Sequence, residues 1–261
     1  MKRFPNVTSP AQLSLPFFIE YKSYVAVELG RSNGLRAEIQ RIKSIMHRLR
    51  KLRYCSEEIM KDLKELQTPK RNKKAYPDIT ETKIKEFLAH IKNLRPDLYG
   101  PIYFMVRTGR RVEETTLIER KDIVWDGINP VKINIRAETT KMDRDAPLNY
   151  LDTELQSHVR QAYQRSNKHQ SVFLFLNKQK KKCDSGVITR FLGEQSENIL
   201  KVRVTSHYFR HRFCTECGKR NLPLIDVMAI SGIKDVGILT KYYSHSTNEG
   251  QAKVLESTRL L

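Results

Sequence analysis

The chain has 261 residues, which is enough for one sizeable domain and a smaller one. Lys and Arg outnumber Asp and Glu by 48 to 29, which gives a formal net charge of +19. A small soluble domain normally carries a net charge of about 2–8 in magnitude. The excess therefore disfavours a self-contained metabolic enzyme and favours a polyanionic partner, chiefly nucleic acid.

The termini and the cysteines indicate a reducing compartment. The chain begins with Met1-Lys2-Arg3, but Pro5 and polar residues follow in place of the apolar core of a signal peptide. No apolar run approaches the roughly 20 residues that span a bilayer. The four cysteines are too sparse for a disulfide framework. We therefore expect a cytoplasmic protein that contacts no membrane.

Two of the cysteines, in Cys214-Thr215-Glu216-Cys217, have the spacing of half a zinc site. A tetrahedral site needs four ligands, and no second Cys or His pair stands at a suitable distance along the chain. We interpret both as small apolar residues on one helix face, and we expect neither a metal nor a cofactor.

The first 68 residues are predicted to be helical. Apolar residues recur at three- and four-residue steps within 16–67, at Leu35, Ile39, Ile42, Met46, Leu49 and Leu52. This pattern fits an amphipathic helix packed on its neighbours or a short coiled coil of fewer than three heptads. We predict a helical DNA-binding or oligomerisation region over 1–68 and a basic, proline-flanked linker over 69–77.

The remainder, 78–261, is predicted to be an α+β catalytic domain, so that the chain is mainly α. Thr80 is a candidate N-cap for a helix that runs through Leu88 and Ile91. Further helices are expected over 98–108 and from about Glu113.

A small antiparallel sheet is expected next in the chain. The β-branched runs 123–125 and 131–135 flank the turn Asp126-Gly127, and 141–148 would add a last strand that begins near Lys141. From Asp152 onward the chain reads as mostly helical, punctuated by Gly186, Gly218, Pro223 and Gly232.

Three charged motifs stand in a fixed order within this domain. They are Arg107-Thr108-Gly109-Arg110-Arg111-Val112-Glu113-Glu114, then Thr205-Ser206-His207-Tyr208-Phe209-Arg210-His211, then Gly232 followed by Thr240-Lys241-Tyr242-Tyr243. Two guanidinium groups can clamp one phosphodiester bidentately, which a lysine does less well. A phenol can supply the attacking oxygen of a covalent mechanism.

These motifs resemble the tyrosine recombinase (phage integrase) family. Residues 108–114 look like its T-G-x-R-x-x-E box, which implies that Arg111 is catalytic and that Glu114 braces the fold. Residues 139–148 look like its T-K hairpin ending in Pro-Leu, which implies a catalytic Lys141. Residues 205–211 look like T-x-H-x-x-R-H and supply His207, Arg210 and His211. The likeness covers 77–250 and leaves out the first 75 residues.

One position departs from the family pattern. The family usually has Leu-Gly-His or Gly-Trp ahead of its nucleophile, and Ser231-Gly232-Ile233 stands here. An isoleucine cannot hydrogen-bond a phosphate oxygen. That role is either missing or filled by Lys234 or His245.

The nucleophile has two candidates. A spacing of ten residues from Gly232 leads to Tyr242, whereas Tyr243-Ser244-His245 looks like the Y-x-H ending of the family. We favour Tyr242, because the segment from Gly232 aligns without a gap, and Tyr243 stays open as the alternative.

The chemistry expected of these residues is attack of Tyr242 Oη on a DNA phosphodiester, which forms a 3′-phosphotyrosyl bond and releases a 5′-hydroxyl. A phenol has a pKa of about 10, so it needs a base or a strong positive field, and His207 is the candidate base. Lys141 is the candidate acid for the leaving oxygen. Arg111 and Arg210 would hold the non-bridging oxygens. Each residue alone has an ordinary explanation as a surface cation or a core aromatic, and their joint order favours a site.

Other basic residues are expected to contact DNA phosphates. They are Lys70, Arg71, Lys73, Lys74, Lys180, Lys181, Lys182 and Arg203. Arg190 and Lys201 are candidates to extend the same groove. The resemblance implies double-stranded DNA as partner and a homotetramer on two DNA sites.

The leading hypothesis is a site-specific recombinase, the integrase of a virus or mobile element. One alternative is a type IB topoisomerase. A second is a DNA-binding protein that has lost cleavage, for which Ile233 is the only indication in the sequence.

Overall fold

The structure is a computed structural model that describes residue 9 and residues 12–30, 32–66, 76–140 and 145–243; for 32–34 and 241–243 it describes the backbone only. The chain divides into two compact units, Met1–Ala75 and Tyr76–Leu261. Most of the predicted linker, 69–75, lies outside the described residues. Its last two residues belong to the second unit, where the Tyr76 ring packs 4.2 Å from the His211 ring.

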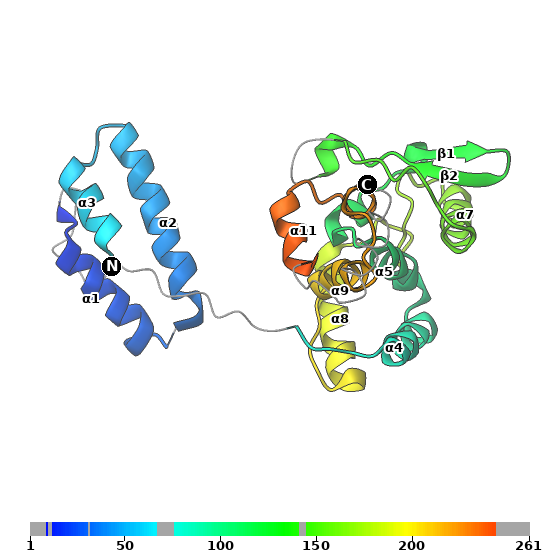
Figure 1. The fold of residues 1–261 in the computed structure, drawn as a ribbon, viewed down its shortest axis with the longest axis horizontal. Helices are drawn as coiled ribbons and strands as arrows, with labels where there is room; N and C mark the ends of the chain where they lie inside the picture. Colours follow the sequence, from blue (N-terminus) through cyan, green and yellow to red (C-terminus); the bar gives the residue numbers. More distant parts are fainter. Residues whose placement is uncertain (1–8, 10–11, 31, 67–75, 141–144, 244–261) are drawn as a thin grey trace, which may run out of the picture. The chain divides into compact units, whose positions relative to one another are not determined.

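The N-terminal unit is a set of helices around its own apolar core (Figure 1). They are α1 (Leu15–Ser23), the π-helical turn η2 (Tyr24–Glu28), α2 (Ser32–Lys51) and α3 (Glu57–Glu65). The region predicted to be helical thus consists of separate helices, and Arg53, between α2 and α3, has a positive φ of 62°. Of the predicted apolar stripe, Leu35, Ile39 and Met46 are buried, while Leu52 lies beyond the helix and is 58% exposed. The stripe therefore packs against the neighbouring helices, as the first of the two interpretations expects.

The C-terminal unit starts with three helices, α4 (Glu81–Leu94), α5 (Pro96–Thr108) and α6 (Val112–Thr116). The predicted N-cap is confirmed, because Thr80 Oγ1 accepts a hydrogen bond from Lys83 N at 3.4 Å. After the sheet, the described residues form the helices α7 (Thr153–Lys168), α8 (Ser185–Leu200), α9 (Ser206–Lys219), α10 (Leu224–Ser231) and α11 (Val236–Tyr243). The unit is mainly helical, as predicted.

The sheet has two strands, β1 (Ile123–Asp126) and β2 (Asn129–Ile133), in one antiparallel hairpin with a bulge between Val124 and Trp125. The third strand predicted over 141–148 is wrong within its described part, 145–148. That part is not a strand, but it contacts the end of the hairpin through a bridge in which Ile133 and Leu148 exchange hydrogen bonds of 2.9 and 2.8 Å. Beyond Ile133 the pairing continues for a short distance, since Asn134 N donates to Asp122 O at 2.8 Å and Ile135 O accepts from Ala146 N at 2.9 Å. The turn η4 (Ala137–Thr139) then follows.

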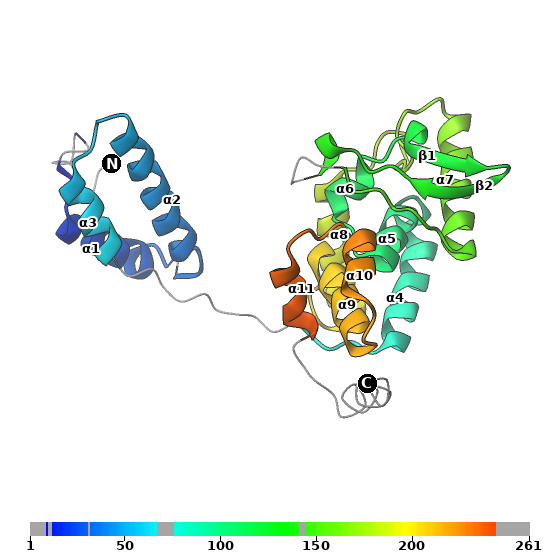
Figure 2. The same cartoon turned by 45° about the horizontal axis from the view of Figure 1, so that its top comes forward.

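The main core of the C-terminal unit holds α9 next to α5, and α11 packs on α9 in turn (Figure 2). Full burial of a large apolar side chain stabilises a fold by about 1.5–3 kcal/mol; Phe87, Ile102 and Phe209 each have 1% exposure or less. Cys214 and Cys217 lie buried on one face of α9 in a smaller cluster with Val227, Ile233 and Leu239, which confirms the helix-face interpretation. No described helix combines the length and apolar character needed to cross a bilayer.

Candidate active site

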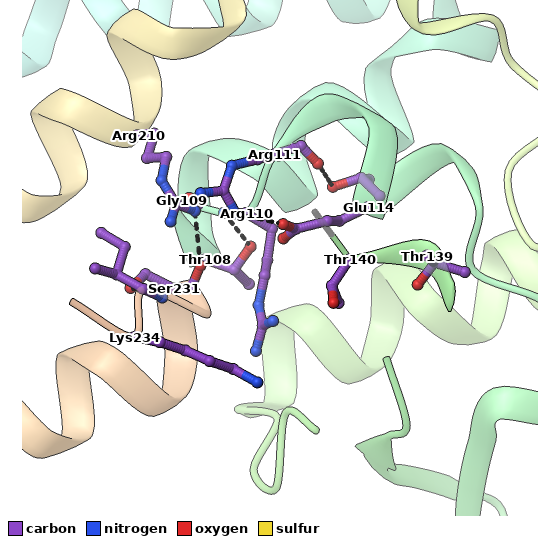
Figure 3. Close-up of polar contacts among 12 residues, drawn as sticks. Thr108, Gly109, Arg110, Arg111, Glu114, Thr139, Thr140, Arg210, Ser231 and Lys234 are labelled. Atoms are coloured by element: carbon purple, nitrogen blue, oxygen red, sulfur yellow. Dashed lines mark hydrogen bonds and ion pairs between the residues drawn. The ribbon is translucent and has the colours of Figure 1, made fainter. Parts of the chain in front are cut away.

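The turn between α5 and α6 is set by its glycine. Helix α5 ends at Gly109, which has a φ of +65°. A Cβ at this position would lie 2.6 Å from Cδ1 of Phe213 on α9, so only glycine fits without a shift. The turn therefore lies directly against α9. Arg110 and Arg111 follow it and have different environments (Figure 3).

Arg111 faces outward from the start of α6. Its Nη1 donates to Glu114 Oε1 at 2.6 Å, and the side chains are 27% and 3% exposed. A charged hydrogen bond to a buried carboxylate restricts the guanidinium to one orientation. The remaining donors of Arg111 are thus held in place at the surface.

Arg210 extends from α9 to the same turn. Its Nη1 donates to Gly109 O and to Ser231 O, at 2.7 Å each. The side chain therefore joins α9 to the α5–α6 turn and to the last residue of α10. His207 lies almost one turn earlier on α9 and is exposed.

An open pocket of about 680 Å³ lies beside Arg111. Its lining consists of Arg111, Val112, Glu113, Ser185, Gly186, Thr189, Arg190, Arg203, Thr205, Ser206 and His207. Helices α8 and α9 both begin here, at Ser185 and Ser206. The unpaired N–H groups and the positive dipole end of a helix N-terminus attract anions. Three arginines against one carboxylate add to this attraction, so the pocket suits a phosphate group.

Comparison of the sequence with protein families decides the relationship of the chain. The profile of the phage integrase family matches residues 77–249, which include the pocket, the α5–α6 turn and α11. The chain belongs to the phage integrase family. No curated protein sequence matches it.

Solved structures of tyrosine recombinases share the fold. The Tn1549 transposon integrase in complex with circular intermediate DNA aligns with a TM-score of 0.66 at 16% identity, over 94% of this chain and 85% of that chain. A lambda integrase dimer bound to a core site aligns with a TM-score of 0.70 at 12% identity, over 93% and 83%. The XerH recombinase bound to its difH substrate aligns with a TM-score of 0.65 at 16% identity, over 100% and 74%.

The position that departs from the pattern of the phage integrase family lies inside the protein. Ile233 is 5% exposed and packs among the buried side chains that include Cys214 and Leu239. The next residue, Lys234, donates from Nζ to Asp145 O at 3.3 Å. The α10–α11 connection thus contacts the segment that follows the predicted hairpin lysine.

His211 contacts the first described residues of the C-terminal unit. Its ring packs on Tyr76, and its Nδ1 lies 3.4 Å from Thr215 Oγ1. Burial lowers the pKa of His211 below its usual value. The side chain thus holds the entry of the C-terminal unit against α9.

The predicted DNA-contacting residues fall into separate places. Arg203 lines the pocket, and its Nη1 lies 3.3 Å from Oε2 of Glu197. The exposed lysines Lys180, Lys181 and Lys182 belong to a loop that Lys178 N anchors to Asp97 Oδ2 at 2.9 Å. Several predicted residues lie outside the described part of the chain, namely Lys70, Arg71, Lys73, Lys74, Lys141 and His245. Tyr242 and Tyr243 have a described backbone in α11 but no described side chain.

Two features of the site were not found from the sequence. One is Arg110, which occupies the variable position of the T-G-x-R box. The other is the start of α8, where Asp184-Ser185-Gly186 has the composition of a loop. Asp184 Oδ1 accepts from Val187 N at 2.8 Å, so the N-cap preference of aspartate was the available signal.

Proposed function

We propose that the chain is a site-specific DNA recombinase that cleaves and rejoins DNA through a 3′-phosphotyrosine intermediate, as the integrase of a virus or mobile element. The observation that carries the proposal is the cationic pocket between the N-termini of α8 and α9, with Arg111 and His207 in its wall. Arg210 supports it, because it is bonded to the turn that presents Arg111.

The scissile phosphodiester binds at Arg111 and Arg210 in this proposal. Glu114 accepts a hydrogen bond from Nη1 of Arg111 and so fixes the orientation of the guanidinium. The other N–H donors of Arg111 stay available for the phosphate. Donors fixed before the reaction stabilise the charge that develops on the phosphoryl oxygens at no cost of reorganisation. Lys234 is the proposed substitute for the family's His or Trp, since Ile233 is buried away from the pocket.

Tyr242 is the proposed nucleophile. Its Oη forms a bond to phosphorus, the bond from phosphorus to the 5′-oxygen breaks, His207 accepts the phenol proton, and Lys141 donates a proton to the leaving oxygen. Rejoining is the reverse of these steps, because the phosphotyrosyl bond keeps the phosphodiester energy. The packing of α11 on α9 supports the assignment, as α9 carries both His207 and Arg210.

Double-stranded DNA is the proposed partner, bound by a tetramer of this chain. The structural neighbours from Tn1549, lambda and XerH are DNA complexes. In the N-terminal unit, the exposed side of α2 carries Arg41, Arg48 and Lys51, opposite its buried Ile39. If about six to ten phosphates are contacted, affinity falls by roughly 10³–10⁵ between 50 and 200 mM salt.

The deciding experiment uses a nicked suicide duplex that carries the attachment site of the element, with wild type, Tyr242→Phe and Tyr243→Phe. We expect a covalent adduct on a denaturing gel that only Tyr242→Phe abolishes. Loss of the adduct in Tyr243→Phe alone would identify Tyr243 as the nucleophile. Tight binding by wild type without an adduct would favour a DNA-binding protein that has lost cleavage. This is the second candidate, because the buried Ile233 cannot hydrogen-bond a phosphate oxygen. Relaxation of supercoils without strand exchange would indicate a topoisomerase.

A further inference from the structure

The C-terminal end of α10 is capped by side chains from elsewhere in the fold. The last four carbonyl groups of a helix have no partner within the helix and need another donor. In α10, Met228 O accepts from Gly232 N at 2.8 Å, as in a glycine-ended helix. Ser231 O accepts from Arg210 Nη1 at 2.7 Å.

Arg110 supplies the two remaining donors. Its Nη2 donates to Ala229 O at 2.8 Å and its Nε donates to Ile230 O at 2.6 Å. All four terminal carbonyls of α10 are therefore bonded, and a single side chain bonds two of them. A guanidinium at this place also carries its charge at the negative end of the helix dipole.

The position of Arg110 is costly for the protein. The residue is 1% exposed, and burial lowers the pKa of its guanidinium to about 10, so that it remains charged at neutral pH. Within the described residues its Nη1 has no hydrogen-bond partner. A buried charge that is incompletely bonded is weak evidence for stabilisation, because well-packed apolar side chains often stabilise as much or more. A role beyond stability explains the residue better.

We propose that Arg110 is a positioning residue that fixes the end of α10 and thereby the start of α11, the helix that carries Tyr242. Only residues 232–235 join the two helices, so the connection transmits the position of one to the other. The next residue after Arg110 is Arg111. The turn that presents the phosphate-binding guanidinium thus also sets the nucleophile helix. Naming Tyr242 as the positioned group rests on the proposed function.

The test uses the full chain with Arg110→Met, which keeps the length but removes the donors, and Arg110→Lys, which keeps the charge. The control is Leu155→Ala, a buried site on α7, which packs on β2 and α5. Hydrogen exchange of the amides in 232–243 is measured first. We expect exchange in Arg110→Met to rise about tenfold or more over wild type, Arg110→Lys to be intermediate, and Leu155→Ala to match wild type after correction for global unfolding.

Adduct formation on the nicked attachment-site duplex is measured second, at saturating DNA. We expect Arg110→Met to slow it on the order of 10²-fold with the Kd for DNA nearly unchanged, because a displacement of about 1 Å costs about that much. The proposal would be overturned if Leu155→Ala, at the same Tm as Arg110→Met, slowed adduct formation equally. It would also be overturned if both Arg110 variants showed the wild-type rate of hydrogen exchange in 232–243. If wild type forms no adduct while Arg110→Met still loosens 232–243, positioning stands and the proposed function fails.

Discussion

The arginines of the C-terminal unit lie in two kinds of environment. Away from the pocket, Arg136 is paired with three carboxylates, those of Glu119, Asp122 and Glu138. At the pocket, Arg111 has one carboxylate, Glu114, as its salt-bridge partner. Arg136 thus lies among acidic side chains, whereas Arg111 keeps donors that Glu114 does not occupy.

The difference indicates where an anion can bind. A guanidinium surrounded by carboxylates has its charge neutralised and attracts a further anion only weakly, whereas an unbalanced one attracts a phosphate at short range. Arg107, paired with Asp152 and Glu154, is of the balanced kind. Carboxylate pairing is not the sole structural arrangement among the described arginines, because Arg110 is buried and bonds backbone carbonyls of α10 instead.

The largest expected effect is a loss of activity when the pocket arginine is removed. Arg111→Ala should slow adduct formation about 10²–10³-fold, because a fixed donor to the developing charge is lost. The midpoint of thermal unfolding should move little. Single-turnover adduct formation and a melting curve measure the two quantities. A variant that unfolds early while cleaving at the wild-type rate would show that Arg111 belongs with the structural arginines.

The second effect is on stability. Arg136→Ala leaves Asp122, whose side chain is 5% exposed, without its cation. Breaking a fully buried pair costs about 3–5 kcal/mol, and since Arg136 is 22% exposed we expect about 1–3 kcal/mol. Urea unfolding of the variant measures this loss. Arg136→Lys should recover part of it, and adduct formation by the folded protein should stay at the wild-type rate.

The smallest effect concerns pH. Burial alone would raise the pKa of Asp97, but its bonds to Arg95 and to Lys178 N outweigh burial and lower it. The folded state therefore favours the carboxylate. This contribution to stability is present above about pH 4, the unfolded pKa, and is lost as the pH falls through the lower folded pKa. Urea unfolding at pH 7 and pH 3 should show a smaller acid loss for Arg95→Gln than for wild type. An equal loss would contradict the assignment.

Local signals in the sequence were sufficient for most of the helices. Thr80 predicted a helix start because a hydroxyl cap acts on a residue three positions away. The turn Asp126-Gly127 predicted the hairpin because Asp-Gly suits a tight turn between two adjacent strands. The third strand failed because, within the described residues, only Ala146 and Leu148 form backbone–backbone hydrogen bonds with the neighbouring segment, which is too short a pairing for a strand and is not revealed by local composition.

The site was predictable only in part. The resemblance of the ordered motifs to those of the family named Arg111, His207 and Arg210 as candidates, whereas each residue alone had an ordinary explanation. The role of Arg110 was not predictable, because its bonds reach Ala229 and Ile230, more than 100 residues away. Long-range packing decides which of two adjacent arginines faces solvent.

The contact between Arg110 and Gly232 has an evolutionary consequence. A Cβ at Gly232 would collide with Nη1 of Arg110, and the glycine has a φ of +67°. A shorter residue at 110 would remove this collision but not the backbone strain, so relatives of this chain are expected to keep glycine at 232 whichever residue stands at 110. Where the arginine is kept, the backbone and the packing both exclude a side chain at 232.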